Sequence, residues 1–304
     1  MTEREDFDKL VDMAMDNPAL TAMRPVVEKE LLHYEIFQAL DREGLLKDLV
    51  FQGGTALRLC RGSDRFSEDL DFAGDVDFSA EKMEKIKDCI EKRIGDRFGL
   101  NVSVSPKPAT TSAGFVKVDK WWISIETAPE NPSMPKQKIK IEIANIPAHT
   151  KELLPLRANY ESVRALPTVL VNTESLDEVM ADKILAFPTS LISKEGNSVG
   201  ISDSKIRHRD IWDLAWLARQ GAKLNSNLVS AKISDYGIQN FDNLLGIAIE
   251  LIPEIVKDRQ FKAQMSRFID SAIVDKMLST DAHFEYLSHT TKAMFLSIRS
   301  DLTR

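Results

Sequence analysis

The sequence predicts an α+β protein in which a mixed sheet with flanking helices is followed by a mostly helical C-terminal domain. Two observations support this fold class. Short runs of β-forming residues alternate with helical segments as far as residue 143, and from about residue 174 onward nearly every segment has the apolar spacing of a helix. The proline-containing stretch 147–167 separates the two patterns. We therefore expect two domains, residues 1–165 and residues 166–304.

The first elements of the N-terminal half form a regular succession. A helix is predicted over residues 25–43, because a proline opens the segment, apolar residues recur at helical spacing and Gly44 closes it. Ser79 is a suitable N-cap for a second long helix. The remaining expected elements are a strand, a short helix, a strand and this second long helix, over residues 48–52, 55–61, 69–73 and 79–95.

A group of β-rich runs follows, with Pro and Gly residues between them. These runs cover residues 102–104, 115–118, 122–126 and 138–143. The last of them alternates strictly, so that three isoleucines lie on one face while Lys138, Lys140 and Glu142 lie on the other. The alternation therefore places a carboxylate on the polar face of a strand.

The composition is that of an ordinary soluble globular protein, with 43% hydrophobic and 29% charged residues. No apolar run approaches the roughly 20 residues that a membrane span needs, and the acidic N-terminus lacks the layout of a signal peptide. The two cysteines, Cys60 and Cys89, have no C-x-x-C spacing, which favours a reduced, cytoplasmic protein.

The net charge of −7 argues against nucleic-acid binding over the whole surface but allows a local basic groove. Two short basic segments are candidates for such a groove, and each could equally be solvated surface. They consist of Arg58, Arg61 and Arg65, and of Lys205, Arg207, His208 and Arg209. The four tryptophans could stack bases, but in a protein of this size tryptophans more often belong to the core.

The stretch from residue 53 to residue 71 carries the strongest functional pattern. Gly53, Gly54 and Thr55 follow a short apolar strand, and their backbone N–H groups can approach a phosphate at a helix start. Asp69 and Asp71 point to the same side if the chain is extended there. Two carboxylates on one face are the hard oxygen ligands that Mg²⁺ takes alongside substrate phosphates. A phosphate-binding turn beside such a metal-binding pair is typical of enzymes that catalyse phosphoryl or nucleotidyl transfer.

Each half of this pattern is weak by itself, because glycine pairs are commonplace turns and Asp-x-Asp occurs by chance in acidic proteins. The joint order of strand, glycine turn, short helix and aspartate pair is far more specific. Glu142 on the later strand could supply a third carboxylate. Three carboxylates at one point repel each other unless a cation lies among them, so a divalent metal, Mg²⁺ or Mn²⁺, is the simplest explanation.

Two helices of the C-terminal half carry further candidates. Ser175 and Glu178 form a capping box, and Lys183 lies within the apolar stripe that follows. A lysine in that position either extends its ammonium outward to solvent or points into a cleft where it meets a triphosphate or a carboxylate. Asp210 lies near the packed face of its helix, and it is either a functional group or a charge favoured by the helix dipole.

These motifs resemble the AbiEii/AbiGii family of nucleotidyltransferase toxins, within the larger polymerase-β-like nucleotidyltransferase superfamily. The superfamily pattern is a glycine turn, a gap, an Asp-x-Asp or Asp-x-Glu pair and a later strand carboxylate. The matching positions here are Gly53, Gly54, Thr55, Asp69, Asp71 and Glu142. The segments 175–186 and 209–217 also resemble family segments, so that Lys183 and either Asp210 or Asp213 match active-site positions, with Asp210 preferred.

The resemblance implies a nucleotidyltransferase-type sheet domain and a Mg²⁺- or Mn²⁺-dependent enzyme that uses an NTP. Gly53, Gly54 and Thr55 would hold the β- and γ-phosphates with help from Arg65, and Asp69 and Asp71 would bind the metal ions. Glu142 would be a third ligand or a base. In the helical half, Lys183 would contact the triphosphate and Asp210 would orient the acceptor or the nucleotide.

The same resemblance implies a toxin of a toxin–antitoxin or phage-defence pair, with a separately encoded antitoxin as partner. Its acceptor would be RNA, with the 3′ end of tRNA preferred, and the added nucleotides would block translation. Three alternatives remain open. The acceptor could be a small molecule such as an aminoglycoside or a protein side chain, the chain could bind a nucleotide without turnover, or it could be a structural interaction protein.

Overall fold

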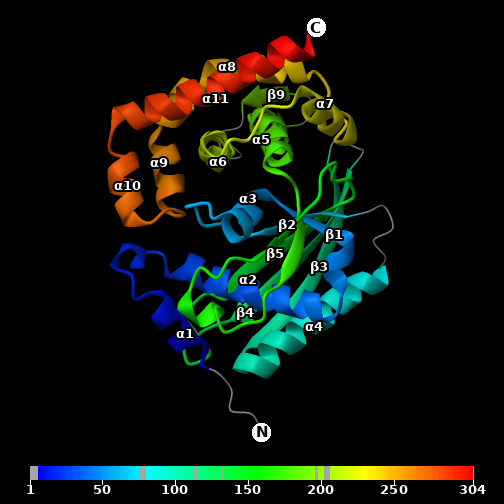
Figure 1. The fold of residues 1–304 in the computed structure, drawn as a ribbon, viewed down its shortest axis with the longest axis vertical. Coiled ribbons are helices and arrows are strands. Elements are labelled where there is room, and N and C mark those ends of the chain that lie inside the picture. The colour runs from blue at the N-terminus through cyan, green and yellow to red at the C-terminus, as the bar shows by residue number, and fades with distance from the viewer. Residues whose placement is uncertain are drawn as a thin grey trace. The chain divides into compact units, whose positions relative to one another are not determined.

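The computed structural model describes residues 6–74, 80–112, 116–131, 133–195, 198–201 and 206–303 (Figure 1). The chain divides into two compact units, Met1–Glu174 and Ser175–Arg304. The division falls later than the expected boundary between residues 165 and 166. The reason is that the strand β7 (Leu170–Thr173) pairs with β1 (Leu49–Gln52) and so belongs to the sheet of the first unit.

The first unit is built on a seven-stranded mixed sheet with the order β3-β4-β5-β2-β1-β7-β6. The pairs β2–β5 and β1–β7 are parallel, and the other neighbouring pairs are antiparallel. This mixed sheet confirms the predicted α+β class. The strands not yet bounded are β2 (Leu70–Gly74), β3 (Asn101–Ser112), β4 (Val116–Glu126), β5 (Gln137–Ala144) and β6 (Glu152–Pro155).

Most of the predicted strands are observed, but two of them are joined into one, and β6 and β7 were not expected from the sequence. The runs 115–118 and 122–126 were expected to be separate, but the structure joins Val116–Glu126 into the single strand β4. The joining follows from pairing, because β4 has β3 on one side and β5 on the other and registers with both along its length. Phe115 and the expected N-cap Ser79 lie outside the described residues.

The helices of the first unit are α1 (Phe7–Ala14), α2 (Arg24–Arg42), α3 (Gly53–Ala56) and α4 (Ala80–Phe98). The helix α2 starts beside Pro25 and ends before Gly44, whose φ of 66° lies in the left-handed region that glycine tolerates. Phe37 of α2 packs against Phe51 and Phe72 of the sheet, with ring centroids 4.8 and 6.1 Å away. The helices α2 and α4 pack together and contact strands β5 and β3.

The isoleucine side of β5 is buried as its alternation indicated, since Ile139, Ile141 and Ile143 are at most 2% exposed. The polar side of the same strand is thereby left to carry Lys138, Lys140 and Glu142, which are exposed or half-buried. This alternation fixes which side of the sheet presents the charged groups described below.

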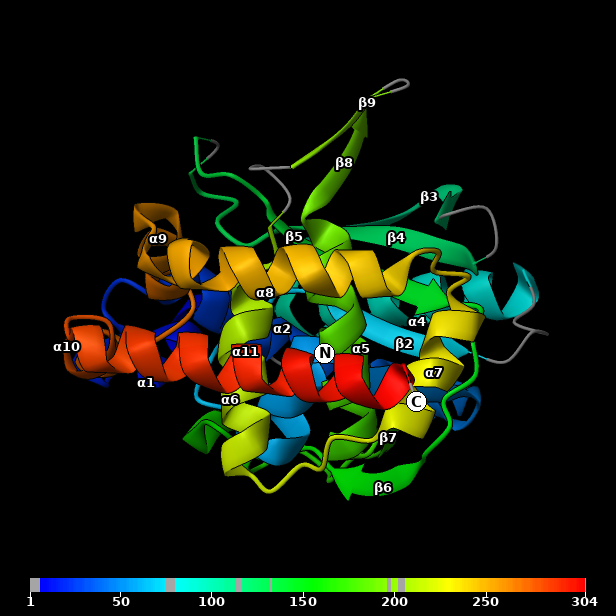
Figure 2. The same cartoon turned by 90° about the horizontal axis from the view of Figure 1, so that it is seen from above.

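The second unit is helical apart from one hairpin, in which β8 (Ile192–Glu195) pairs with β9 (Ser198–Ile201). Its core contains Trp212, Leu214 and the stacked pair Phe187 and Phe295. Its helices are α5 (Leu176–Ser190), α6 (His208–Arg219), α7 (Ser226–Asp235), α8 (Phe241–Lys257), α9 (Arg259–Ser266), α10 (Ser271–Met277) and α11 (Asp281–Leu302). The helices α8 and α11 lie side by side along much of their length (Figure 2). In the described part of the chain, no helix is both long enough and apolar enough to cross a membrane.

Candidate active site

The glycine turn joins β1 directly to α3, and each glycine is required by a neighbouring side chain. Gly53 has a φ of 77°, and a Cβ added to it would lie 2.8 Å from Oδ2 of Asp71. A Cβ on Gly54 would collide with the guanidinium of Arg65 and lie 3.1 Å from Oγ of Ser67. The two glycines therefore let the segment 65–71 approach the turn closely.

Thr55 and Arg65 are buried parts of this same turn. The Thr55 side chain, in a residue that is 1% exposed, donates a hydrogen bond to the backbone oxygen of Asp69. Arg65 is 2% exposed and its Nη1 donates to the backbone oxygen of Phe66 at 2.7 Å. Both side chains thus fix the path of the chain that leads to the aspartate pair.

The two aspartates lie at the start of β2. Leu70 and Phe72 are buried on one side of this strand, so the intervening Asp71 faces the other side. Because β2 and β5 are parallel neighbours, Asp71 and Glu142 are register partners. The sheet therefore brings Glu142 beside the Asp-x-Asp pair, as the strand pattern suggested.

Two lysines lie among these carboxylates. Nζ of Lys140 is 3.1 Å from Oδ2 of Asp69 and 3.4 Å from Oε1 of Glu142. Nζ of Lys120 is 2.8 Å from the same Glu142 oxygen. Burial disfavours the charged forms of Lys140 and Glu142, but the surrounding opposite charges prevail, so the pKa of Lys140 is raised and the pKa of Glu142 is lowered.

Carboxylates are suitable ligands for a divalent metal, but those of Asp69 and Glu142 are paired with lysine ammonium groups in this arrangement. Within the part of the chain that the structure describes, no group of three or more His, Cys, Asp or Glu side chains is arranged to hold a metal ion. Asp69 and Asp71 remain a fitting pair, because Mg²⁺ is usually bound by one or two carboxylates together with substrate phosphates. The carboxylate of Asp71 lies directly against Gly53, where a Cβ would come within 2.8 Å of its Oδ2.

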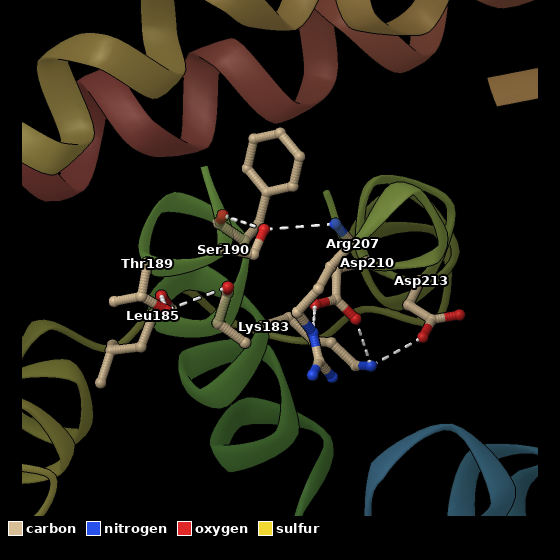
Figure 3. Close-up of polar contacts among 9 residues, drawn as sticks. Lys183, Leu185, Thr189, Ser190, Arg207, Asp210 and Asp213 are labelled. Atoms are coloured by element: carbon tan, nitrogen blue, oxygen red, sulfur yellow. Dashed lines mark hydrogen bonds and ion pairs between the residues drawn. The ribbon is translucent and has the colours of Figure 1, made fainter. Parts of the chain in front are cut away.

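The predicted residues of the helical half form a compact ionic cluster within the second unit (Figure 3). Nζ of Lys183, on α5, is 2.6 Å from Oδ1 of Asp210 and 2.9 Å from Oδ2 of Asp213, both on α6. Nε of Arg207 is 2.6 Å from the other oxygen of Asp210. Oγ of Ser190 accepts a hydrogen bond from the backbone N–H of Arg207 at 3.2 Å, which ties the end of α5 to the start of α6.

This second cluster is almost completely buried. The side chains of Lys183, Asp210 and Asp213 are 6%, 2% and 0% exposed. Burial alone would raise the pKa of Asp210, but the charges of Arg207 and Lys183 outweigh it and hold that pKa below its ordinary value. Lys183 therefore meets carboxylates inside the protein, and both aspartates are its partners.

Sequence reasoning missed a neighbouring buried cluster in which two acids of α5 meet a lysine of α7. Lys232 of α7 is fully buried, and its Nζ is 2.8 Å from Oε1 of Glu178 and 3.2 Å from Oδ1 of Asp182. Ser175 caps α5 as predicted, because its side chain accepts a hydrogen bond from the backbone N–H of Glu178. The four-residue spacing of Glu178 and Asp182 was the available signal, since it places both acids on one side of α5.

The two basic segments are engaged within their own units. Arg58 pairs with Glu30 at 2.9 Å, and Arg61 pairs with Glu152 at 2.5 Å. In the other segment, His208 is buried against Phe261, Arg209 lies over the ring of Phe268, and Lys205 lies outside the described residues. Most of the basic side chains that suggested a groove therefore make contacts within the protein.

The tryptophans are largely core residues. Trp121, Trp212 and Trp216 are at most 5% exposed. Trp122 is half-buried, and in the register of β4 and β5 it is the partner of Lys140. Of the four, Trp122 alone lies on the polar side of the sheet that carries the carboxylates.

Comparison with known proteins gives one family and several similar folds. The profile of the family described as nucleotidyl transferase AbiEii toxin, type IV toxin–antitoxin system, matches residues 35–287. MenT4, a nucleotidyltransferase toxin from Mycobacterium tuberculosis, is similar in structure, with a TM-score of 0.57, 15% identity, and coverage of 96% of this chain and 90% of that one. JHP933 from Helicobacter pylori has a TM-score of 0.50, 18% identity, and coverage of 91% and 93%. No curated protein matches the sequence.

Proposed function

The chain belongs to the AbiEii family of nucleotidyltransferase toxins, and we propose that it transfers a nucleoside monophosphate from an NTP to an RNA acceptor, the 3′ end of tRNA. The observation that carries this proposal is the assembly of Asp69, Asp71 and Glu142 on one side of the sheet, against a turn that only glycine permits. Metal-bound carboxylates beside a phosphate-binding turn are what nucleotidyl transfer needs.

In the proposed reaction, a hydroxyl oxygen of the acceptor attacks the α-phosphorus of the NTP. A new phosphodiester bond forms, and the bond between the α-phosphorus and the oxygen that bridges to the β-phosphate breaks. Pyrophosphate leaves with that oxygen, and the hydroxyl proton passes to a base or to solvent. The atoms balance without any oxidant or further co-reactant.

Asp69 and Asp71 are the proposed ligands of Mg²⁺ or Mn²⁺. When bound, the metal neutralises charge on the phosphates and activates the attacking hydroxyl. Glu142 is the proposed third ligand or base, and Oε1 of its carboxylate contacts Lys120 and Lys140. Its register position beside Asp71 supports this assignment.

The glycine turn is the proposed binding site of the β- and γ-phosphates. Gly53 and Gly54 open α3, where backbone N–H groups have no partner within the helix and can donate to phosphate oxygens. Thr55 and Arg65 are assigned to the same nucleotide site, with Arg65 placing a buried positive charge directly against Gly54. In this assignment their role is to hold the turn and its charge in place.

Lys183 and Asp210 are the proposed contributions of the helical half. The ammonium of Lys183 would contact the triphosphate, while Asp210 would orient the acceptor or the nucleotide. The contacts of Lys183 with both Asp210 and Asp213 support treating the three as one group, with Asp213 as a second carboxylate that positions the ammonium. Each of these roles is open to direct substitution.

Membership of a type IV toxin–antitoxin family implies an antitoxin partner. We propose that this partner is a separately encoded protein, that the toxin acts in the cytoplasm, and that nucleotides added to tRNA block translation. A role in phage defence follows from the same reasoning, since a toxin that halts translation limits the growth of an infected cell.

The deciding experiment supplies each α-³²P-labelled NTP in turn, with Mg²⁺ and total tRNA, to the wild type and to Asp69→Ala/Asp71→Ala. Label that appears on tRNA with the wild type only, and is lost on ribonuclease treatment, would support the proposal and identify the nucleotide. Label that resists ribonuclease would instead identify a protein or small-molecule acceptor. If the toxic effect on cells persists in the double variant, the protein binds a nucleotide without turnover.

A further inference from the structure

The polar side of β5 holds a cation at the place where a metal would bind. Lys140 contacts Asp69 of the β2 start and Glu142 of its own strand, at 3.1 and 3.4 Å. The pKa of Lys140 is raised despite its burial because Asp69, Glu142 and Asp71 all act on its charge. The ammonium therefore already neutralises part of the charge that the three carboxylates bring together.

We propose that Lys140 is a built-in counter-cation that competes with the divalent metal for Asp69, so that the metal binds only as Lys140 releases that carboxylate. This inference rests on the proposed function, since it takes Asp69 and Asp71 as the metal ligands. Lys140 acts through these carboxylates and is thus a positioning residue of the site.

The surroundings of Lys140 allow it to leave. Its side chain is 23% exposed. A partly exposed lysine ammonium on its flexible four-carbon stem reorients more easily than one in a buried ion pair. Glu142 keeps a partner after the release, because Lys120 holds the same oxygen at 2.8 Å. A divalent ion and an ammonium that share one carboxylate repel each other, so metal at Asp69 favours the released position of Lys140.

The consequence is that the metal alone binds weakly. An NTP adds phosphate oxygens as further metal ligands, and these offset the loss of the lysine contacts. Lys140 would thereby link metal binding to the arrival of the nucleotide. Between turnovers, the ammonium would keep the carboxylates together without a metal.

The test is direct titration of Mn²⁺, without nucleotide or RNA, followed by the loss of the free-ion EPR signal. Lys140→Gln should bind Mn²⁺ about three- to tenfold more tightly than the wild type, the range expected when two partly exposed ion pairs no longer compete. A lysine that merely supports the fold predicts the opposite, because its removal would loosen the carboxylates. Unchanged or weaker binding by a folded Lys140→Gln would overturn the inference.

Lys138 provides a matched control, because it lies on the same side of the same strand and is exposed. Lys138→Gln removes the same charge without removing a contact to Asp69, so its Mn²⁺ affinity should stay within about twofold of the wild type, as expected for a screened surface charge. Equal tightening in both variants would mean a general charge effect and would overturn the inference. Lys140→Arg keeps the cation and should not bind Mn²⁺ more tightly than the wild type.

Asp69→Asn separates this inference from the proposed function. If Asp69→Asn loses Mn²⁺ binding while Lys140→Gln does not gain it, the metal assignment stands and the competition by Lys140 is refuted. If Asp69→Asn binds Mn²⁺ as the wild type does, the metal is not at Asp69, and the metal assignment fails together with the inference. Thermal unfolding of each variant confirms that the titrated protein is folded.

Discussion

The ionic cluster around Asp69 and the one around Lys183 contain the same kinds of groups in opposite environments. In the first unit, the side chains of Lys140 and Asp69 are 23% and 35% exposed. In the second unit, those of Lys183 and Asp210 are 6% and 2% exposed. The difference teaches which charges can be exchanged, since an exposed ion pair has little net strength while a buried one cannot lose a partner cheaply.

The depth of each cluster also matches its proposed role. A site that takes up a metal and a nucleotide in each cycle needs carboxylates whose present partners can leave, as Lys140 can. A group that stays in place throughout the cycle needs the opposite, and the two carboxylates of α6 fix Lys183 in this way. The comparison can be tested by measuring what each lysine contributes to the free energy of unfolding.

The largest expected effect is that of Lys183→Met. The substitution leaves Asp210 and Asp213 buried without their shared ammonium, which should cost about 3–5 kcal/mol in the free energy of unfolding. Lys140→Met should cost no more than about 1 kcal/mol, because its partners are partly solvated. Urea unfolding measures both, with the tryptophans of β4 as fluorescent reporters of the first unit and those of α6 as reporters of the second.

The matched rescue is Lys183→Met/Asp213→Asn, which removes one of the stranded charges and should recover part of the stability. Equal losses for Lys183→Met and Lys140→Met would contradict the distinction between the two clusters. A loss without any rescue would show that packing of the lysine stem, and not its charge, dominates the second cluster.

A smaller effect is expected at the turn that supports the first cluster. Gly54→Ala forces the buried guanidinium of Arg65 away, and such overpacking typically costs about 1–3 kcal/mol. The displaced Arg65 should also disturb the turn. The rate of nucleotide transfer should therefore fall by more than the loss of folded protein explains. Differential scanning calorimetry and the labelled-tRNA assay together measure the two losses.

Gly95 of α4 is the control, since a Cβ there meets its nearest atom, the backbone oxygen of Leu100, at 3.8 Å. Gly95→Ala should stabilise by about 0.5–1 kcal/mol, because alanine loses less backbone entropy in a helix. If Gly54→Ala behaved like Gly95→Ala, the close approach of Arg65 would not constrain the turn.

The sequence predicts the first cluster's acids better than its bases. Alternation along residues 138–143 placed Glu142 on the polar side, and the Asp-x-Asp spacing placed its partners. That Lys140 would reach Asp69 depends on the parallel pairing of β2 with β5, a contact between distant segments that local patterns do not encode. The same limit explains the later unit boundary, which the pairing of β7 with β1 decides.

In the second cluster, the sequence identified the residues but left open whether the lysine pointed inward or outward. The apolar stripe around Lys183 was compatible with a solvated ammonium and with a buried one. Only the packing of α5 against α6 decides between them, because it brings two carboxylates of a different helix to the lysine. Residue type and spacing therefore predicted the chemistry, and tertiary contacts determined its depth.

The smallest expected effect, a shift in pKa with salt, tests whether depth governs these charges generally. Asp210 and Asp242 both have a lowered pKa, the former because Arg207 and Lys183 outweigh its burial and the latter because Arg299 hydrogen-bonds to it. At 1 M salt the screening length falls to about 3 Å, so the pKa of the exposed Asp242 should move back toward its ordinary value. The pKa of the buried Asp210 should change little, because counterions cannot approach it.

Titration of ¹³C-labelled aspartate carboxyls by NMR at low and high salt measures both shifts, with Asp210→Asn and Asp242→Asn to assign the signals. The stability that follows from Asp210 has a defined sign. Because its folded pKa lies below the unfolded value of about 3.9, this contribution is present above that pH and is lost as the pH falls through the lowered folded pKa. Salt should therefore leave unchanged the pH at which the second unit unfolds in acid, while it removes the pKa shift of Asp242. A parallel response of the two carboxyls would mean that solvent reaches the Lys183 cluster, and the contrast between a fixed and an exchangeable cluster would not hold.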